Sequence, residues 1–121
     1  MLENVRVPTL ALAKLGACSE NARHLWSVEL VRDGKRKLEL DFLCLVEGKL
    51  SAGEAKSNGT LSGREATAEV GKTLTGASHA QADQVVFATT DPEWSQPMQD
   101  VVQDLVSPLD RPRALLLTAL A

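Results

Sequence analysis

The sequence has few aromatic residues, few cysteines and no long hydrophobic run. Its aromatic residues are Trp26, Phe42, Phe87 and Trp94, and tyrosine is absent. So small a set argues against a single-strand nucleic-acid binder built on stacked aromatic platforms. Cys18 and Cys44 are far apart, and no Cys or His spacing predicts a zinc site. We expect Cys44 to be a small core residue, because it falls on the apolar side of its predicted strand.

No segment has the pattern of a secretory signal peptide, and no apolar run is long enough to span a membrane. With cysteine so scarce, we expect a reducing, cytoplasmic setting. The chain of 121 residues is long enough to bury a core and short enough to form a single domain over residues 1–121.

Positive charge is also scarce, because the net charge is −3, which is unfavourable for a free nucleic-acid binder. The distribution is uneven, with a net charge of +1 over residues 1–72 and −4 over residues 73–121. Basic residues gather around one predicted turn: Arg32, Lys35, Arg36 and Lys37. They form either a solvated hairpin tip or a set of phosphate contacts. Lys72, on a later predicted helix, is either a further phosphate contact or a surface residue.

The most informative segment reads LELDFLCLVEGKLSAGEAKS and predicts two strands of one hairpin. In the first strand, alternation places Leu40 and Phe42 on the face opposite Asp41. In the second strand, Glu54 and Lys56 share a face because they are two residues apart. If pairing puts that face on the side of Asp41, the sheet carries two acids and a lysine together.

Such a set has a chemical use, because two carboxylates at short range repel one another unless a cation lies between them. Hard oxygen ligands of this kind suit Mg²⁺ or Mn²⁺. Such a metal lowers the pKa of a bound water and holds a phosphate oxygen, while a nearby lysine offsets developing negative charge. Taken singly, Asp41 could be a solvated charge, and Glu54 with Lys56 an exposed pair of little energetic value. Taken together, the three residues predict a site for phosphodiester hydrolysis.

Asp41, twelve intervening residues and then Glu54-Ala55-Lys56 resemble the PD-(D/E)xK nuclease superfamily, which has the restriction-endonuclease-like fold. The resemblance implies an α/β fold with an αβββαβ core, in which helices flank a central mixed sheet. It also implies a metal-dependent nuclease that hydrolyses phosphodiester bonds in DNA, or else in RNA, with Mg²⁺ or Mn²⁺ as cofactor. Asp41, Glu54 and Lys56 would be catalytic, and Asp41, Glu54 and the Ala55 carbonyl would hold the metal.

The partners implied by this resemblance are nucleic acid, with DNA expected first, and a second copy of the chain or a larger host protein. A small acidic domain offers little surface to grip a duplex alone. The end of the chain also falls almost at the end of the last predicted strand, which suits a domain that works with a larger protein. No membrane partner is expected.

Two features depart from the family pattern. Leu40 stands where proline commonly precedes the acid, and the first helix carries no convincing acid. Glu20 is the only acid there, and a helix-start position explains it more simply. This favours the alternative of a non-catalytic nuclease-like module that binds nucleic acid or a protein partner. A third interpretation is an unrelated α/β domain in which ELD and EAK coincide by chance.

Turn, cap and periodicity signals predict the other elements. They are a helix over Glu20–His24 after a Ser19 cap, a strand over Leu25–Arg32, a turn at Asp33-Gly34, a helix from a Ser62–Glu65 capping box to about Ala77, a buried strand over Gln84–Ala88, a helix after an Asp91 cap, and a last strand over Arg113–Leu120.

Overall fold

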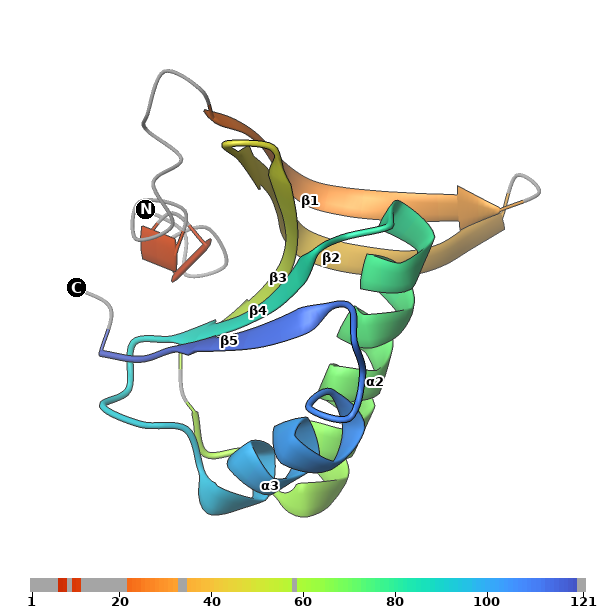
Figure 1. Ribbon diagram of the computed structural model, residues 1–121. Coiled ribbons are helices and arrows are strands. Elements are labelled where there is room, and N and C mark those ends of the chain that lie inside the picture. The colour runs from red at the N-terminus through yellow and green to blue at the C-terminus, as the bar shows by residue number, and fades with distance from the viewer. Residues whose placement is uncertain (1–6, 9, 12–21, 33–34, 58, 120–121) are drawn as a thin grey trace.

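The computed structural model describes residues 7–8, 10–11, 22–32, 35–57 and 59–119. Within this part of the chain, a five-stranded mixed sheet with the strand order β1-β2-β3-β4-β5 carries the helices α2 and α3, and residues 7–8 and 10–11 are also helical (Figure 1). The elements are β1 (Ala22–Arg32), β2 (Lys35–Val46), β3 (Lys49–Lys56), α2 (Gly63–Ala80), β4 (Gln84–Thr89), α3 (Gln96–Leu105) and β5 (Arg113–Leu117). The prediction of an α/β fold with a mixed sheet is therefore confirmed.

The sheet has an antiparallel half and a parallel half. Strands β1, β2 and β3 pair antiparallel, and the turn between β2 and β3 places Glu47 and Gly48 at positive φ, as tight hairpins require. Strands β3, β4 and β5 pair parallel, so helices α2 and α3 must carry the chain back between them. Because the strand order advances one way across the sheet, right-handed crossovers place both helices on one face, as Figure 1 shows.

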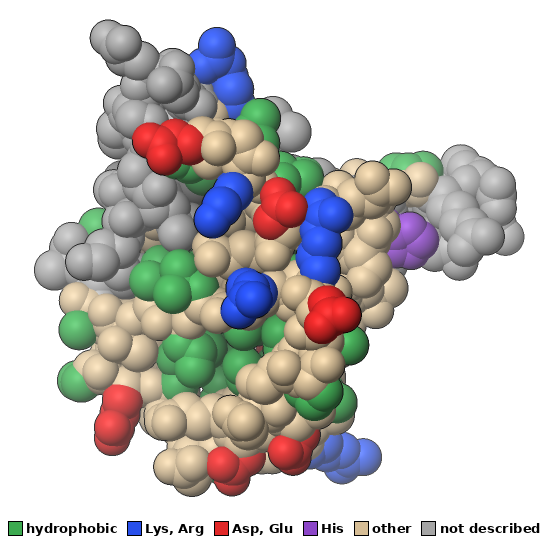
Figure 2. Space-filling model, in the orientation of Figure 1, with side chains coloured by type: hydrophobic (Ala, Val, Ile, Leu, Met, Phe, Trp, Pro, Cys, Tyr) green, Lys and Arg blue, Asp and Glu red, His purple; other side chains and the backbone are tan. Residues whose placement is uncertain are grey.

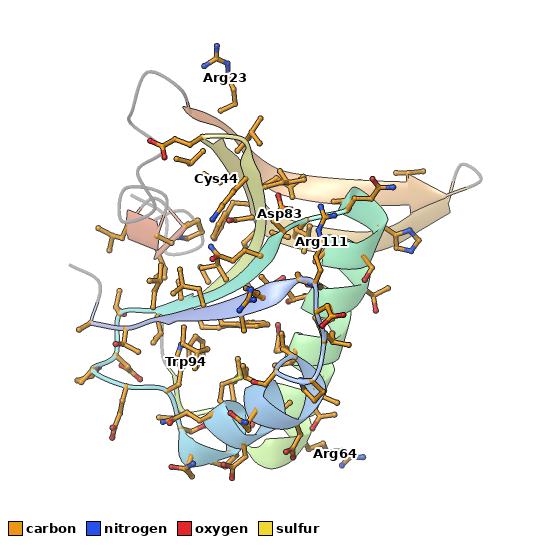
Figure 3. The ribbon with its side chains drawn as sticks, viewed as in Figure 1. Arg23, Cys44, Arg64, Asp83, Trp94 and Arg111 are labelled. Carbon is orange, nitrogen blue, oxygen red and sulfur yellow. The ribbon has the colours of Figure 1, made fainter. Side chains whose placement is uncertain are left out.

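Two apolar clusters cover the two faces of the sheet. On the helix side, residues from the sheet pack against the buried stripe of α2, which includes Ala66 and Val70. Trp94 lies between the sheet and the helices (Figure 3), and its indole N–H donates to the Phe87 carbonyl at 3.1 Å. On the opposite side, Val7 packs in a cluster that contains Phe42, Cys44, Val86 and Ala88. The predicted core position of Cys44 is confirmed by its burial.

Several predicted elements are confirmed with small changes in length. The capping box is present, because Ser62 Oγ accepts from the Glu65 amide at 3.2 Å and the Glu65 carboxylate accepts from the Ser62 amide at 3.2 Å. Helix α2 runs three residues beyond the predicted end at Ala77. The buried strand is confirmed as β4, and the last strand ends at Leu117 rather than Leu120.

One predicted helix is absent, and another is present but begins later than predicted. In place of the predicted helix over Glu20–His24, strand β1 begins at Ala22. Pairing with β2 supplies backbone hydrogen bonds that so short a helix lacks. Ser19, Glu20 and the predicted turn at Asp33-Gly34 lie outside the described residues. The later helix begins after a Ser95 cap rather than an Asp91 cap. The Asp91 carboxylate instead accepts from the Gly59 amide at 2.7 Å and holds the loop after β3.

The predicted alternation along β2 is also wrong at one point. Leu40 belongs to the cluster on the helix side, where its side chain packs against Gly76 of α2. Phe42 belongs to the cluster on the opposite side. Strict alternation would put the two side chains on one face. The strand therefore departs from regular geometry around Asp41, between these two residues.

The ring of Phe42 lies directly over Gly53, which faces it across the ladder between β2 and β3. A methyl group at residue 53 would occupy the space of this buried ring, so Gly53→Ala should lower the free energy of unfolding by about 2 kcal/mol. Gly71 is the matched control, because no atom lies within 4 Å of a Cβ built there. Gly71→Ala should instead raise stability by up to about 1 kcal/mol through helix propensity. Urea unfolding of both variants measures this, and equal effects would contradict the Phe42 contact.

Candidate active site

Asp41 lies where strands β2 and β3 stop pairing. The register between the two strands runs from Val46 opposite Lys49 to Phe42 opposite Gly53 and ends there. Beyond this point a side chain replaces the backbone acceptor, because Asp41 Oδ2 accepts a hydrogen bond from the Ala55 amide at 2.8 Å. A carboxylate that accepts from a backbone amide is held in one orientation. The site therefore forms in the opening between the two strands.

Glu54 lies beside Asp41 and is buried under α2. Glu54 is only 4% exposed, because β3 is the central strand of the sheet and α2 packs across it. Lys72 from α2 places its Nζ 3.4 Å from Glu54 Oε1. Among the described residues, however, Glu54 Oε1 has no hydrogen-bond partner. A buried carboxyl oxygen without one is energetically costly, so this atom is a candidate ligand position.

The environment of Glu54 favours its neutral form. Burial and, second to it, the negative charge of Asp41 raise the pKa of Glu54 to about 8 against the opposing effect of Lys72. Glu69 and a hydrogen bond with Asp41 act in the same direction as burial. Near neutral pH, Glu54 therefore holds a proton when no divalent cation is bound beside it.

Lys56 is linked to the acid pair through α2 rather than directly. Its Nζ lies 3.2 Å from Glu69 Oε1, while Glu69 Oε2 lies 3.9 Å from the Nζ of Lys72. Glu69 thus stands between two lysines. Burial alone would lower the pKa of Lys72, but the carboxylates of Glu54 and Glu69 outweigh it and the pKa is raised, so this lysine stays charged at neutral pH.

The structure brings together most of the predicted site. Asp41, Glu54 and the Ala55 backbone lie together just beyond the last ladder pair, and Lys72 joins them although the sequence left it open as a phosphate contact or a surface residue. Lys56 lies on the same network but pairs with Glu69. The side chains of Arg32, Lys35, Arg36 and Lys37 lie outside the described set, so the structure places only their backbone, at one end of the β1–β2 hairpin.

Glu69 is the functional residue that the sequence analysis missed. The signal was available, because the capping box fixes where α2 begins and the buried stripe through Ala66, Val70 and Thr73 fixes its phase. Residue 69 falls on the border of that stripe, toward the sheet. A charged side chain at the border of the buried stripe lies close to the side chains of the neighbouring strand.

A pocket of about 290 Å³ opens at the carboxyl end of β3, beside this network. It is lined by Lys56, Ser57, Thr60, Leu61 and Glu65. The pocket opens to solvent beside Lys56. The other described pockets lie at the opposite end of the parallel strands, near Arg111, which Figure 3 shows beside Asp83.

The donor set fits a hard divalent cation in type. Asp41 and Glu54 supply two carboxylates, and Glu54 Oε1 has no hydrogen-bond partner within the described chain. No group of three or more His, Cys, Asp or Glu side chains that could hold a metal occurs among the residues described here. Ligands beyond the two carboxylates would have to be backbone carbonyls or water, which suits Mg²⁺ because it usually keeps several waters.

Charges of both signs are mixed on the face of the molecule drawn in Figure 2. On that face, the described Lys and Arg side chains are interspersed with Asp and Glu and form no broad patch of one sign. A duplex held by many phosphate contacts needs a continuous basic surface. The described part of this face does not offer one.

No protein-family model, no curated protein and no solved structure matches the chain. In the part of the chain that the structure describes, neither helix is long and apolar enough to cross a membrane.

The raised pKa of Glu54 makes the metal-free protein sensitive to pH. Because the Glu54 carboxyl ionises at higher pH in the folded state than in the unfolded state, its contribution to stability is full below about pH 4.5 and falls as pH rises toward about 8. The expected loss is at most about 1.4 kcal/mol for each pH unit between 5 and 8. Urea unfolding at a series of pH values, with a chelator present, measures it.

Glu54→Gln should flatten this pH dependence, since an amide of the same shape does not titrate. Glu47→Gln is the matched control, because Glu47 is exposed at the hairpin turn, and it should keep the wild-type dependence. A wild-type protein whose stability does not fall between pH 5 and 8 would contradict the raised pKa of Glu54.

Proposed function

We propose that the chain is a metal-dependent nuclease that hydrolyses phosphodiester bonds, with Asp41 and Glu54 as the acids of its active site. The observation that carries the proposal is the buried carboxyl group of Glu54 beside the half-buried carboxyl group of Asp41. Burying a carboxyl group next to a second acid costs stability. Natural sequences keep such a cost mainly where function demands it.

We further propose that the fold is of the restriction-endonuclease-like type. The support is the order of elements: Asp41 lies on the second strand of an antiparallel meander, Glu54 and Lys56 lie on the third, and a helix then leads to a parallel strand. That is the order which the resemblance of the ELD and GEAKS segments implies. Coincidence of the two motifs in an unrelated α/β domain would not by itself predict this placement.

Asp41, Glu54 and the Ala55 carbonyl would hold Mg²⁺ or Mn²⁺. A divalent cation bound there would polarise a phosphate oxygen and make a bound water a better nucleophile. Asp41 is already fixed by the Ala55 amide, so it would need little reorganisation. Lys56 lines the pocket at the end of β3, where its ammonium would attract and orient a phosphate group. The burial of Glu54 excludes water and strengthens these electrostatic contributions.

Calorimetric titration with Mn²⁺ and a cleavage assay on single-stranded, duplex and branched substrates test this function together. We expect wild-type protein to bind Mn²⁺, and the Asp41→Asn, Glu54→Ala double variant to bind it at least about tenfold more weakly. Cleavage should fall by about a hundredfold or more in the same variant, because both proposed ligands are lost.

The control for this experiment is Glu47→Gln, which removes an exposed carboxylate at the far end of the hairpin and should leave both measurements unchanged. Metal binding without cleavage of any substrate would favour the alternative function, a non-catalytic nuclease-like module that binds nucleic acid or a protein partner. Folded wild-type protein that binds no Mn²⁺ would refute the nuclease mechanism.

The basic residues at the β1–β2 turn are proposed phosphate contacts. If both side chains contact phosphate, Arg36→Ser with Lys37→Ser should weaken duplex binding and reduce the slope of log affinity against log salt by about 2. Lys49→Ser with Arg113→Ser removes the same charge from two exposed strand positions and should leave the slope unchanged. Fluorescence anisotropy at several salt concentrations measures this, and identical slopes in both double variants would refute a role for the turn.

A further inference from the structure

Lys72 stands between two buried carboxylate oxygens. Its Nζ lies 3.4 Å from Glu54 Oε1 and 3.9 Å from Glu69 Oε2. Within the described residues, neither of these two oxygens has a hydrogen-bond partner. The ammonium group therefore has two anionic positions within reach and is tightly bonded to neither.

The two positions differ in what else is near them. Glu54 Oε1 belongs to the pair with Asp41, where a divalent cation would bind if the proposed function holds. Glu69 Oε2 belongs to a carboxylate whose other oxygen is already paired with Lys56 at 3.2 Å. A shift of about 1 Å would bring Lys72 Nζ from its present distance to hydrogen-bonding range of Glu69. The flexible four-carbon side chain of lysine permits such a shift.

We propose that Lys72 acts as an internal counter-cation which occupies Glu54 in the absence of metal, and that Glu69 is the positioning residue which receives Lys72 when a divalent cation binds. This rests on the proposed function only in placing the cation at Asp41 and Glu54. Two like charges cannot share Glu54 Oε1 at short range, so binding of the cation displaces the ammonium. Glu69 makes that displacement easier because it offers a second acceptor next to the first.

The exchange also concerns Lys56. Once Lys72 has moved, both carboxylate oxygens of Glu69 hold a lysine, and the two ammonium groups stand together on one side of the acid pair. Glu69 then pairs with both lysines and holds their positive charge on the side of the site where a phosphate group would bind. It touches neither the cation nor the substrate, so it is a positioning residue.

Calorimetric titration with MgCl₂ alone, near pH 9, tests this exchange through binding rather than activity. Lys72→Met should bind Mg²⁺ about tenfold more tightly than wild type, because the competing cation is gone. Lys49→Met is the charge-matched control, since Lys49 begins β3 at the end opposite to the site, and it should bind like wild type. Unchanged affinity in Lys72→Met would overturn the proposal.

Glu69→Gln separates the exchange from a simple charge effect. In the wild-type background it should weaken Mg²⁺ binding about threefold or more, because the displaced ammonium loses its acceptor. In the Lys72→Met background it should have a clearly smaller effect, since no ammonium has to be accommodated. An equal loss in both backgrounds would mean that Glu69 acts only through its own charge, and would overturn the exchange.

Failure of this inference differs from failure of the proposed function. Wild-type protein that binds Mg²⁺ and cleaves nucleic acid, with no effect of Lys72→Met on affinity, overturns the exchange alone. Absence of Mg²⁺ binding in every folded variant overturns both. If Lys72→Met does not fold, as judged by circular dichroism, Lys72→Gln replaces it with a shorter polar side chain and the same expected gain in affinity.

Discussion

The burial of the Glu54 carboxyl group is the constraint on which the rest of the site depends. Glu54 lies on the central strand of the sheet and under the longest described helix, so water cannot stabilise its charge. An isolated buried carboxylate would be prohibitively costly. Two groups reduce that cost, a proton on Glu54 itself near neutral pH and the ammonium group of Lys72 beside it. A divalent cation can take the place of both the proton and the ammonium group, as the proposed metal site requires.

The topology makes this encounter between strand and helix unavoidable. Strand β4 pairs parallel with β3, so the chain must return across the sheet, and α2 performs that return directly over β3. The Ser62–Glu65 capping box fixes where the helix begins. From that start, the helical period places Glu69 and Lys72 beside Glu54 and Lys56. A short local signal at one end of the helix thus determines which charges meet in the middle of the domain.

The sequence predicts the parts of the site that depend on short-range rules. The pairing of Asp41 with Glu54 follows from a period of two and a tight hairpin, and the start of α2 follows from its capping box. The partner of Lys56 could not be predicted, because it depends on how far α2 lies from β3. The side on which Leu40 packs likewise depends on Gly76, whose missing side chain leaves room for the leucine on the helix. Tertiary contacts of this kind leave no periodic trace in the sequence.

The balance of charge in the network explains why two lysines accompany three acids. With Asp41, Glu54 and Glu69 ionised and Lys56 and Lys72 protonated, the five groups carry one net negative charge. A proton on Glu54 makes the set neutral, which is what the low-dielectric interior favours. Replacing that proton with a divalent cation leaves one net positive charge instead. In the proposed function, the site would therefore attract a phosphate group only after the cation has bound, because neither form without the cation is positively charged.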